Sequence, residues 1–193
     1  MKKVFLLLAV LALNLSIAAQ EHLAFKGIPI DGTRQSFVKK LKEKGFSYMG
    51  EEDGIVMLTG DFAGYKNCLI GVNTLKDKDL VSYVAVIFPF RDTWTQLMSD
   101  YNAYKKLLTE KYGEPSDEEE HFNDRYTESS ESNLSKMHAL HSGEYVWYTE
   151  FTTELGRIEL TIGSLDYDKA SVVLRYYDKI NTENVKSAII DDL

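Results

Sequence analysis

The pattern that most constrains the fold of this chain occurs twice: one amphipathic helix precedes four short segments rich in β-branched and aromatic residues. The first helix is predicted to begin after Asp31-Gly32-Thr33 and to end at Gly45, because Asp and Thr favour helix starts and glycine favours the position after a helix. Turn residues such as Asp53-Gly54 separate the segments that follow. The predicted strands are 46–50, 55–62, 68–74 and 81–88.

A second, longer helix is predicted after Asp92 and Thr93, ending at Gly113. Its apolar residues recur at helical spacing, and we expect this stripe to pack on a sheet rather than to hold a cofactor. The stripe consists of Trp94, Leu97, Tyr101, Tyr104, Leu108 and Tyr112. Four strands are predicted to follow, over 118–122, 145–152, 157–163 and 171–177. A last helix, 181–193, is predicted to be capped by Asn181 or Thr182 and to dock through an apolar stripe.

The predicted fold class is α+β, with two helix-plus-four-strand halves forming antiparallel sheet and the helices on one face. The halves cover 24–88 and 89–177. The similar helix starts are compatible with a duplicated half and with chance, because Asp and Thr caps are common.

The amino-terminal residues predict export. Two lysines precede an apolar run over 4–13, and small residues follow up to Ala19. This is the order of a secretory signal peptide, and a run of about ten residues is too short for a membrane-spanning helix, which needs about twenty. We therefore expect a signal peptide over 1–19, a single α+β domain over 20–193 with no membrane span, and a periplasmic or secreted location.

Charge and cysteine content narrow the classes of partner. Acidic residues number 30 against 22 basic ones, which disfavours nucleic acid and anionic membrane surfaces as partners. The single cysteine, Cys68, cannot form an internal disulfide, so the fold has to rest on its hydrophobic core. Cys68 opens an apolar run, which favours a buried thiol over a reactive one.

Metal binding has weak support in the sequence. The segment 114–136 is rich in Glu, Asp, Ser and Asn, lacks the glycine-punctuated pattern of a calcium loop, and is expected to be largely a mobile, solvated loop. His138 and His141 are three residues apart, and on a helix this spacing places both imidazoles on one face. Together with His121 they form an alternative zinc hypothesis, although the HExxH motif of zinc hydrolases is absent.

No catalytic motif stands out in the chain. It has no Gly-x-Ser-x-Gly elbow and no glycine-rich phosphate or dinucleotide fingerprint, so no cofactor is expected. A carboxylate pair for glycoside hydrolysis stays open among the many acidic residues. A hydrolase acting on envelope or dietary polymers is therefore the alternative to a binding module.

Alternation in the second half predicts an open sheet face. In Arg157-Ile158-Glu159-Leu160-Thr161-Ile162 the apolar residues point to a core and the polar ones point away. The same period in the neighbouring strands predicts a contact surface for a protein or glycan, because Tyr and Arg are enriched at binding hot spots. Its residues are Tyr148, Glu150, Arg157, Glu159, Arg175 and Tyr177. A merely solvated face is the competing interpretation, since the strand register is unknown.

Three segments carry a family resemblance: Phe25-Lys26-Gly27-Ile28-Pro29-Ile30-Asp31-Gly32-Thr33, Gly60-Asp61-Phe62-Ala63-Gly64-Tyr65 and Asp178-Lys179-Ile180-Asn181. With the leading signal, the chain resembles exported proteins of gut anaerobic bacteria, which implies an exported location and no particular activity. The doubled helix-plus-four-strand order also resembles the fold of the β-lactamase inhibitory protein, whose concave sheet binds its target enzyme. This chain departs from that protein in having one cysteine instead of the four needed for two disulfides. A binding or interaction module is the predicted function.

Overall fold

The computed structural model describes residues 21–74, 79–123, 132–166 and 169–191. The predicted signal peptide, 1–19, and the middle of the acidic segment, 124–131, lie outside the described residues.

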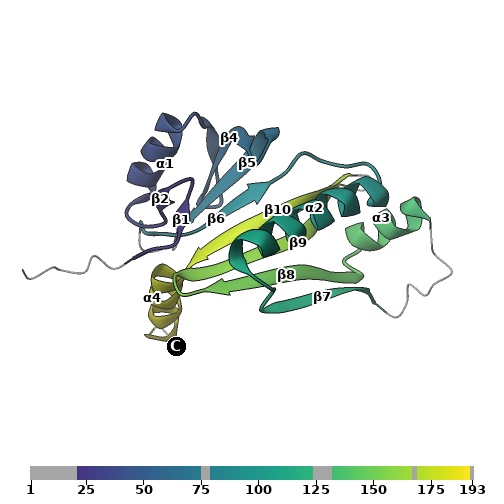
Figure 1. Ribbon diagram of the computed structural model, residues 1–193. Coiled ribbons are helices and arrows are strands. Elements are labelled where there is room, and N and C mark those ends of the chain that lie inside the picture. The colour runs from purple at the N-terminus through teal and green to yellow at the C-terminus, as the bar shows by residue number, and fades with distance from the viewer. Residues whose placement is uncertain (1–20, 75–78, 124–131, 167–168, 192–193) are drawn as a thin grey trace, which may run out of the picture.

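Eight strands form one antiparallel sheet in the order β3-β4-β5-β6-β10-β9-β8-β7 (Figure 1). A two-stranded hairpin, β1 (Ala24–Phe25) and β2 (Ile28–Pro29), precedes the sheet in the chain. The strands of the first half are β3 (Ser47–Glu52), β4 (Ile55–Phe62), β5 (Tyr65–Thr74) and β6 (Val81–Ile87). Those of the second half are β7 (Asp117–Phe122), β8 (Tyr145–Thr153), β9 (Gly156–Asp166) and β10 (Lys169–Asp178). The helices are α1 (Arg34–Glu43), α2 (Trp94–Tyr112), α3 (Asn133–His141) and α4 (Lys179–Asp191).

The two halves join at the centre of the sheet. Helix α1 precedes β3 to β6, helix α2 precedes β7 to β10, and the last strands of the halves, β6 and β10, pair antiparallel. The strand order is therefore mirrored about the β6–β10 pair, as an approximate two-fold axis through that pair requires. The prediction of an α+β fold with antiparallel sheet is confirmed.

Helices α1 and α2 begin and end where their capping residues predict. Thr33 and Thr93 are the N-caps, and their hydroxyl oxygens accept hydrogen bonds from the backbone N–H groups of Ser36 at 3.2 Å and Gln96 at 3.3 Å. Helix α2 ends at Gly113, whose φ of +88° suits glycine best among the residues. Local sequence alone therefore determines the extent of these helices.

The core lies between the helices and one face of the sheet. Inward-pointing residues of β9, such as Ile158 and Leu160, are fully buried, and the apolar stripe of α2 packs over β8, β9 and β10. Figure 1 shows α2 crossing in front of these strands. Each fully buried Leu or Ile contributes about 1.5–3 kcal/mol. Cys68 belongs to the same core and burial raises the pKa of its thiol, so the buried thiol prediction is confirmed.

The buried carboxylate of Asp178 joins the two ends of the described chain. Its oxygens accept hydrogen bonds from the backbone N–H groups of Leu23 at 2.8 Å and Asn181 at 2.9 Å, and His22 Nδ1 lies 3.0 Å away. The Asn181 amide in turn donates to the carbonyls of Ile30 at 2.9 Å and Val81 at 3.0 Å. We call this group the Asp178 clasp: it ties the amino-terminal hairpin, the start of β6 and the start of α4 together.

The last helix starts earlier than predicted. Helix α4 begins at Lys179, and Asp178, rather than Asn181 or Thr182, accepts the hydrogen bond from the first turn. The predicted start was wrong because β10 continues directly into the helix, which leaves no loop in which a later residue can cap. The apolar stripe predicted for this helix rests on side chains outside those the structure describes.

Helix α3 was not predicted. It begins beside Ser132, whose hydroxyl accepts from Ser135 N at 3.1 Å, and it buries Met137 and Leu140 against the core. Part of the segment expected to be a loop is therefore helical. No helix among the described residues is long and apolar enough to cross a membrane.

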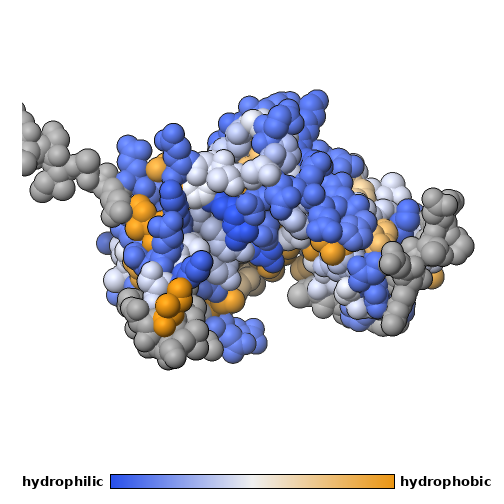
Figure 2. Space-filling model, turned by 90° about the horizontal axis from the view of Figure 1, so that it is seen from below, coloured by the Kyte–Doolittle hydropathy of each residue, from blue (hydrophilic) through white to orange (hydrophobic). Residues whose placement is uncertain are grey.

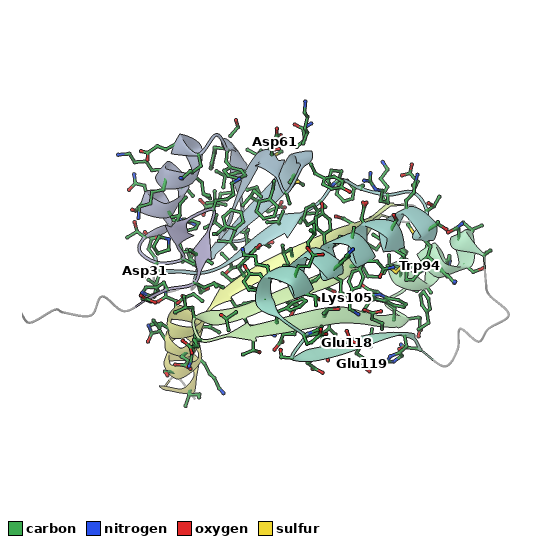
Figure 3. The ribbon with its side chains drawn as sticks, in the orientation of Figure 1. Asp31, Asp61, Trp94, Lys105, Glu118 and Glu119 are labelled. Atoms are coloured by element: carbon green, nitrogen blue, oxygen red, sulfur yellow. The ribbon has the colours of Figure 1, made fainter. Side chains whose placement is uncertain are left out.

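The edge strand β7 carries charge on both faces. Glu118 and Glu120 point toward α2, where Lys105 Nζ lies 2.7 Å from a carboxylate oxygen of each. Figure 3 shows Lys105 beside Glu118. Charged residues on an edge strand disfavour pairing with further strands. Seen from below the view of Figure 1, where β7 and α4 lie, the surface is largely hydrophilic (Figure 2).

Candidate functional site

The face of the sheet opposite α1, α2 and α3 is the candidate site. Its side chains alternate with the buried core residues along each strand, and those of the central strands are partly exposed. The register aligns them in rows across strands. One row contains Asn73, Tyr83, Tyr177 and Arg157, and the next contains Ala85, Arg175, Glu159 and Glu150. We call this surface the open face.

The first row brings two tyrosine rings and a guanidinium group into contact. The rings of Tyr83 and Tyr177 have centroids 5.0 Å apart, and the Arg157 guanidinium carbon lies 4.3 Å from the Tyr177 ring centroid. Because β10 lies between β6 and β9, Tyr177 has Tyr83 on one side and Arg157 on the other. Asn73 Nδ2 donates a 2.9 Å hydrogen bond to the Tyr83 hydroxyl at the end of the row. Cross-strand contacts of this kind hold each side chain in one orientation.

A network of ion pairs links the second row to Arg157 of the first row. Arg175 Nη1 donates to Glu159 Oε1 at 2.6 Å, and Arg157 Nη1 donates to Glu150 Oε2 at 2.8 Å and lies 3.5 Å from Glu159 Oε2. These side chains are 18–41% exposed, so each pair contributes at most about 1 kcal/mol to stability. The network nevertheless fixes the geometry of four charges on the face of the sheet opposite α1, α2 and α3.

Burial and the charge of Glu159 raise the pKa of the Tyr177 hydroxyl, against the opposing effect of Arg175 and Arg157. This hydroxyl is therefore protonated at neutral pH and available as a hydrogen-bond donor or acceptor.

The first half of the open face is apolar. Partly exposed aliphatic side chains of β4, β5, β6 and β10 lie together there: Ile55, Met57, Leu69, Ile87 and Val173. The register places Gly71 and Ala85, the smallest residues of the face, between Met57 and Arg175. Apolar groups next to fixed charges on an uncovered face are typical of contact surfaces.

A pocket of about 300 Å³ lies where the open face meets the first turn of α4. Its lining combines the end of the planar row with helix residues: Thr152, Thr153, Gly156, Arg157, Tyr177, Lys179, Thr182 and Glu183. The hydroxyl oxygen of Thr182 is buried and has no hydrogen-bond partner among the described residues. We call this the α4 pocket.

Most of the site residues predicted from sequence lie together. Glu150, Arg157, Glu159, Arg175 and Tyr177 are linked by the contacts of the two rows. Tyr148 is on the same face one row further along β8, where its hydroxyl donates to Asp117 at 2.9 Å.

Sequence reasoning missed Tyr83 and Asn73. Strand β6 reads Val81-Ser82-Tyr83-Val84-Ala85-Val86-Ile87, which is apolar on both faces, so alternation does not indicate which side Tyr83 faces. Tyr83 joins Tyr177 only through the β6–β10 register, which no local pattern predicts.

The structure does not bring together the three histidines of the metal hypothesis. His138 and His141 lie on α3, which packs on the core face of the sheet, and His141 Nδ1 is 3.3 Å from Ser164 of β9. His121 pairs in register with Val146 on the opposite face, so the sheet separates it from the other two. Within the described ranges no group of three or more His, Cys, Asp or Glu side chains is placed to hold a metal ion.

The two carboxylates at the centre of the open face lie in ion pairs. Glu150 and Glu159 are direct cross-strand neighbours, and each is bonded to an arginine.

Comparison of the chain with protein-family models, with curated protein sequences and with solved structures finds no match. The resemblance to exported proteins of gut anaerobes, and the looser one to the β-lactamase inhibitory protein, therefore stay predictions.

Proposed function

We propose that this protein is an exported binding module that contacts a protein partner through its open face. The observation that carries the proposal is the row of contacts between Tyr83, Tyr177 and Arg157, which lies beside a partly exposed apolar area. Tyrosine and arginine dominate binding hot spots because they bury a large area and form directional hydrogen bonds.

Rigidity supports binding over mere solvation. A side chain that is already ordered loses little entropy on association, and each rotamer-rich side chain that has to be immobilised costs about 0.5–1.5 kcal/mol. Cross-strand contacts already order Tyr177, Arg157 and Arg175. In this arrangement the aliphatic side chains supply apolar area, and the alternating charges select and orient the partner.

A protein partner is favoured over a glycan. Sugar rings bind to aromatic side chains by packing on an open ring face, and the Tyr177 ring is already in contact with Tyr83 on one side and Arg157 on the other. The apolar area of Ile55, Met57 and Leu69 also suits a protein surface better than a hydroxyl-rich polymer.

Export is part of the proposal and is supported by the signal-like residues 1–19. The partner is then a periplasmic or extracellular protein. The alternative, a hydrolase of envelope or dietary polymers, has only the adjacent Glu150 and Glu159 in its favour.

The test is paired affinity capture from an envelope and culture-fluid extract of the source cells. The bait is the purified protein, compared with a Tyr83→Ala/Arg175→Ala variant. Arg175 is chosen because Glu159 keeps Arg157 as a partner after its removal. The matched control, Arg34→Ala/Tyr48→Ala, removes the same residue types near α1, on the other side of the sheet.

A partner that both the unchanged protein and the control retain, and that the open-face variant binds at least about 30-fold more weakly, would support the proposal. Circular dichroism and urea unfolding have to show that the variants are folded. Equal retention by all three proteins would place the contact elsewhere. Capture of a polysaccharide would favour a glycan partner, and release of sugars from it would favour the hydrolase alternative.

A further inference from the structure

We infer that the α4 pocket is a binding site for a single carboxylate group, which an acidic side chain of the partner supplies. The inference deepens the proposed function and rests on it, because Thr152, Arg157 and Tyr177 belong both to the pocket and to the open face. The pocket volume of about 300 Å³ fits one side chain or a small organic acid and little more.

Arg157 supplies the first donor group. All its hydrogen bonds to described residues use Nη1, which leaves the N–H groups of Nε and Nη2 without a partner in the described part of the chain. A guanidinium has five N–H donors in a planar fork that matches a carboxylate. Its contact with the Tyr177 ring at 4.3 Å and its bond to Glu150 at 2.8 Å hold the guanidinium at the pocket wall.

Helix α4 supplies two further donors on one side. Lys179, Thr182 and Glu183 are three and four residues apart, so they project from the same face of the helix and line the same pocket. Lys179 is exposed and forms no ion pair with a described residue. Thr182 Oγ1 is buried without a partner among the described residues, and a buried hydroxyl that lacks a hydrogen bond is destabilising. A carboxylate oxygen in the pocket would accept from both groups.

The charges around the pocket favour a monoanion. Two cations, Arg157 and Lys179, line it together with one carboxylate, Glu183. Glu150 and Glu159 lie just outside, bonded to Arg157. A phosphate carries nearly two negative charges at neutral pH and would meet the repulsion of these three carboxylates. A carboxylate carries one charge and matches the planar fork.

The Asp178 clasp holds the two walls of the pocket in place. Asp178 separates Tyr177 of the open face from Lys179 of the helix, and its carboxylate is fully buried and bonded to backbone N–H groups on the other side. The pocket is therefore formed before any ligand arrives, which lowers the cost of binding.

The experiment is an NMR titration of the isotope-labelled protein with N-acetylglycine, which offers one carboxylate, and with its neutral amide as the matched probe. We expect N-acetylglycine to shift the backbone signals of Gly156, Arg157, Lys179 and Thr182 with a Kd of about 1–10 mM. The amide should bind at least about fivefold more weakly. Inorganic phosphate, titrated in parallel at constant ionic strength, should also bind more weakly than N-acetylglycine.

Variants decide whether the donors act as described. Lys179→Gln should weaken N-acetylglycine binding about two- to fivefold, and Thr182→Val about two- to tenfold. The matched control, Lys186→Gln, changes an exposed lysine of the same helix outside the pocket and should leave the Kd unchanged. Equal binding of acid and amide, or an unchanged Kd in both pocket variants, would overturn the inference.

The titration distinguishes this inference from the proposed function. If the open-face variant loses partner capture but the protein does not bind N-acetylglycine, the proposed binding module is supported and the carboxylate site is refuted. If N-acetylglycine binds but no partner is captured, the pocket is a site for small acids and the proposed protein partner is refuted.

Discussion

Replacing Asp178 by alanine should be among the most destabilising changes in this protein, because one buried carboxylate satisfies groups from the amino-terminal segment and from the first turn of α4. Asp178 is fully buried and accepts from the N–H groups of Leu23 and Asn181, with His22 Nδ1 3.0 Å away. Alanine removes the acceptor and leaves these two backbone donors without it.

The magnitude follows from those two donors. Each buried N–H group left unsatisfied costs about 1–3 kcal/mol, so the loss is about 2–6 kcal/mol before the contact with His22 is included. Domains of this size have a free energy of unfolding of about 5–15 kcal/mol, so the change removes a large part of the total. Asp178→Asn should lower the free energy of unfolding by less than Asp178→Ala. Its amide oxygen can still accept one of the two backbone hydrogen bonds, whereas its NH₂ group cannot accept the other.

Equilibrium urea unfolding measures this effect as a shift of the midpoint at constant slope. The matched control is Asp53→Asn, which changes an exposed aspartate of the β3–β4 turn and should alter the free energy by less than about 0.5 kcal/mol. A loss of unfolding free energy below about 1 kcal/mol for Asp178→Ala would refute the reasoning, because it would mean that the N–H groups of Leu23 and Asn181 do not depend on the Asp178 carboxylate. Faster hydrogen exchange at Leu23 is a second expected result.

Three further changes test packing, titration and an ion pair. Gly60→Ala should lower the free energy of unfolding by about 1–3 kcal/mol, because the added Cβ would lie 2.4 Å from Phe46 Cδ1. The control Gly50→Ala adds a Cβ with no atom within 4 Å and should leave the free energy nearly unchanged in the same urea assay. Burial raises the pKa of the hydroxyl groups of Tyr101, Tyr104 and Tyr176, so the unfolded state loses these protons at a lower pH than the folded state does. The free energy of unfolding should therefore fall above pH 10 by about 1.4 kcal/mol per pH unit for each tyrosine. An unfolding midpoint that does not change between pH 9.5 and 11 would contradict this. Lys105→Met should lower the free energy of unfolding by about 1 kcal/mol, because Glu118 and Glu120 of β7 would then lie beside each other without the lysine. The control Lys106→Met changes the exposed neighbouring lysine and should have no effect on thermal unfolding.

The elements that could be predicted from sequence are those with local signals. Thr33 and Thr93 cap their helices through contacts three residues away, and the alternation in 157–162 separates core from surface within one strand. Such signals need no knowledge of the rest of the chain. The α+β class and most strand positions follow from them.

Elements with ambiguous local signals were missed. The turn at Lys26-Gly27 has positive φ at both residues and closes the β1–β2 hairpin, yet its strands have only two residues each, below the length at which alternation is visible. Helix α3 follows an acidic run, and its apolar residues are few, so composition suggested a loop. Tertiary packing of Met137 and Leu140 provides the stabilisation that local propensity lacks.

The composition of the candidate site depends on how the strands pair, which no local sequence signal indicates. Tyr177, Arg157 and Arg175 could be placed on one face by alternation within their own strands, but Tyr83 joins them only because β6 pairs with β10 in one register. A shift of one residue would turn Tyr83 into the core and bring Val84 to the open face. Residues that are 94 positions apart in the chain thus meet through backbone pairing, which the sequence does not encode locally.

The two halves share a backbone plan but differ in the chemistry of their open faces, and this difference bears on what they contact. Ile55, Met57 and Leu69 occupy β4 and β5, whereas Arg157, Glu159 and Glu150 occupy the corresponding strands β9 and β8. The mirrored strand order makes these two areas lie on opposite sides of the central pair. Under the proposed function, a partner that covers the face would have to present an apolar area and a charged area at a fixed separation and in one direction. The mirrored backbone arrangement thereby carries an asymmetric open face, which would favour a single orientation of such a partner.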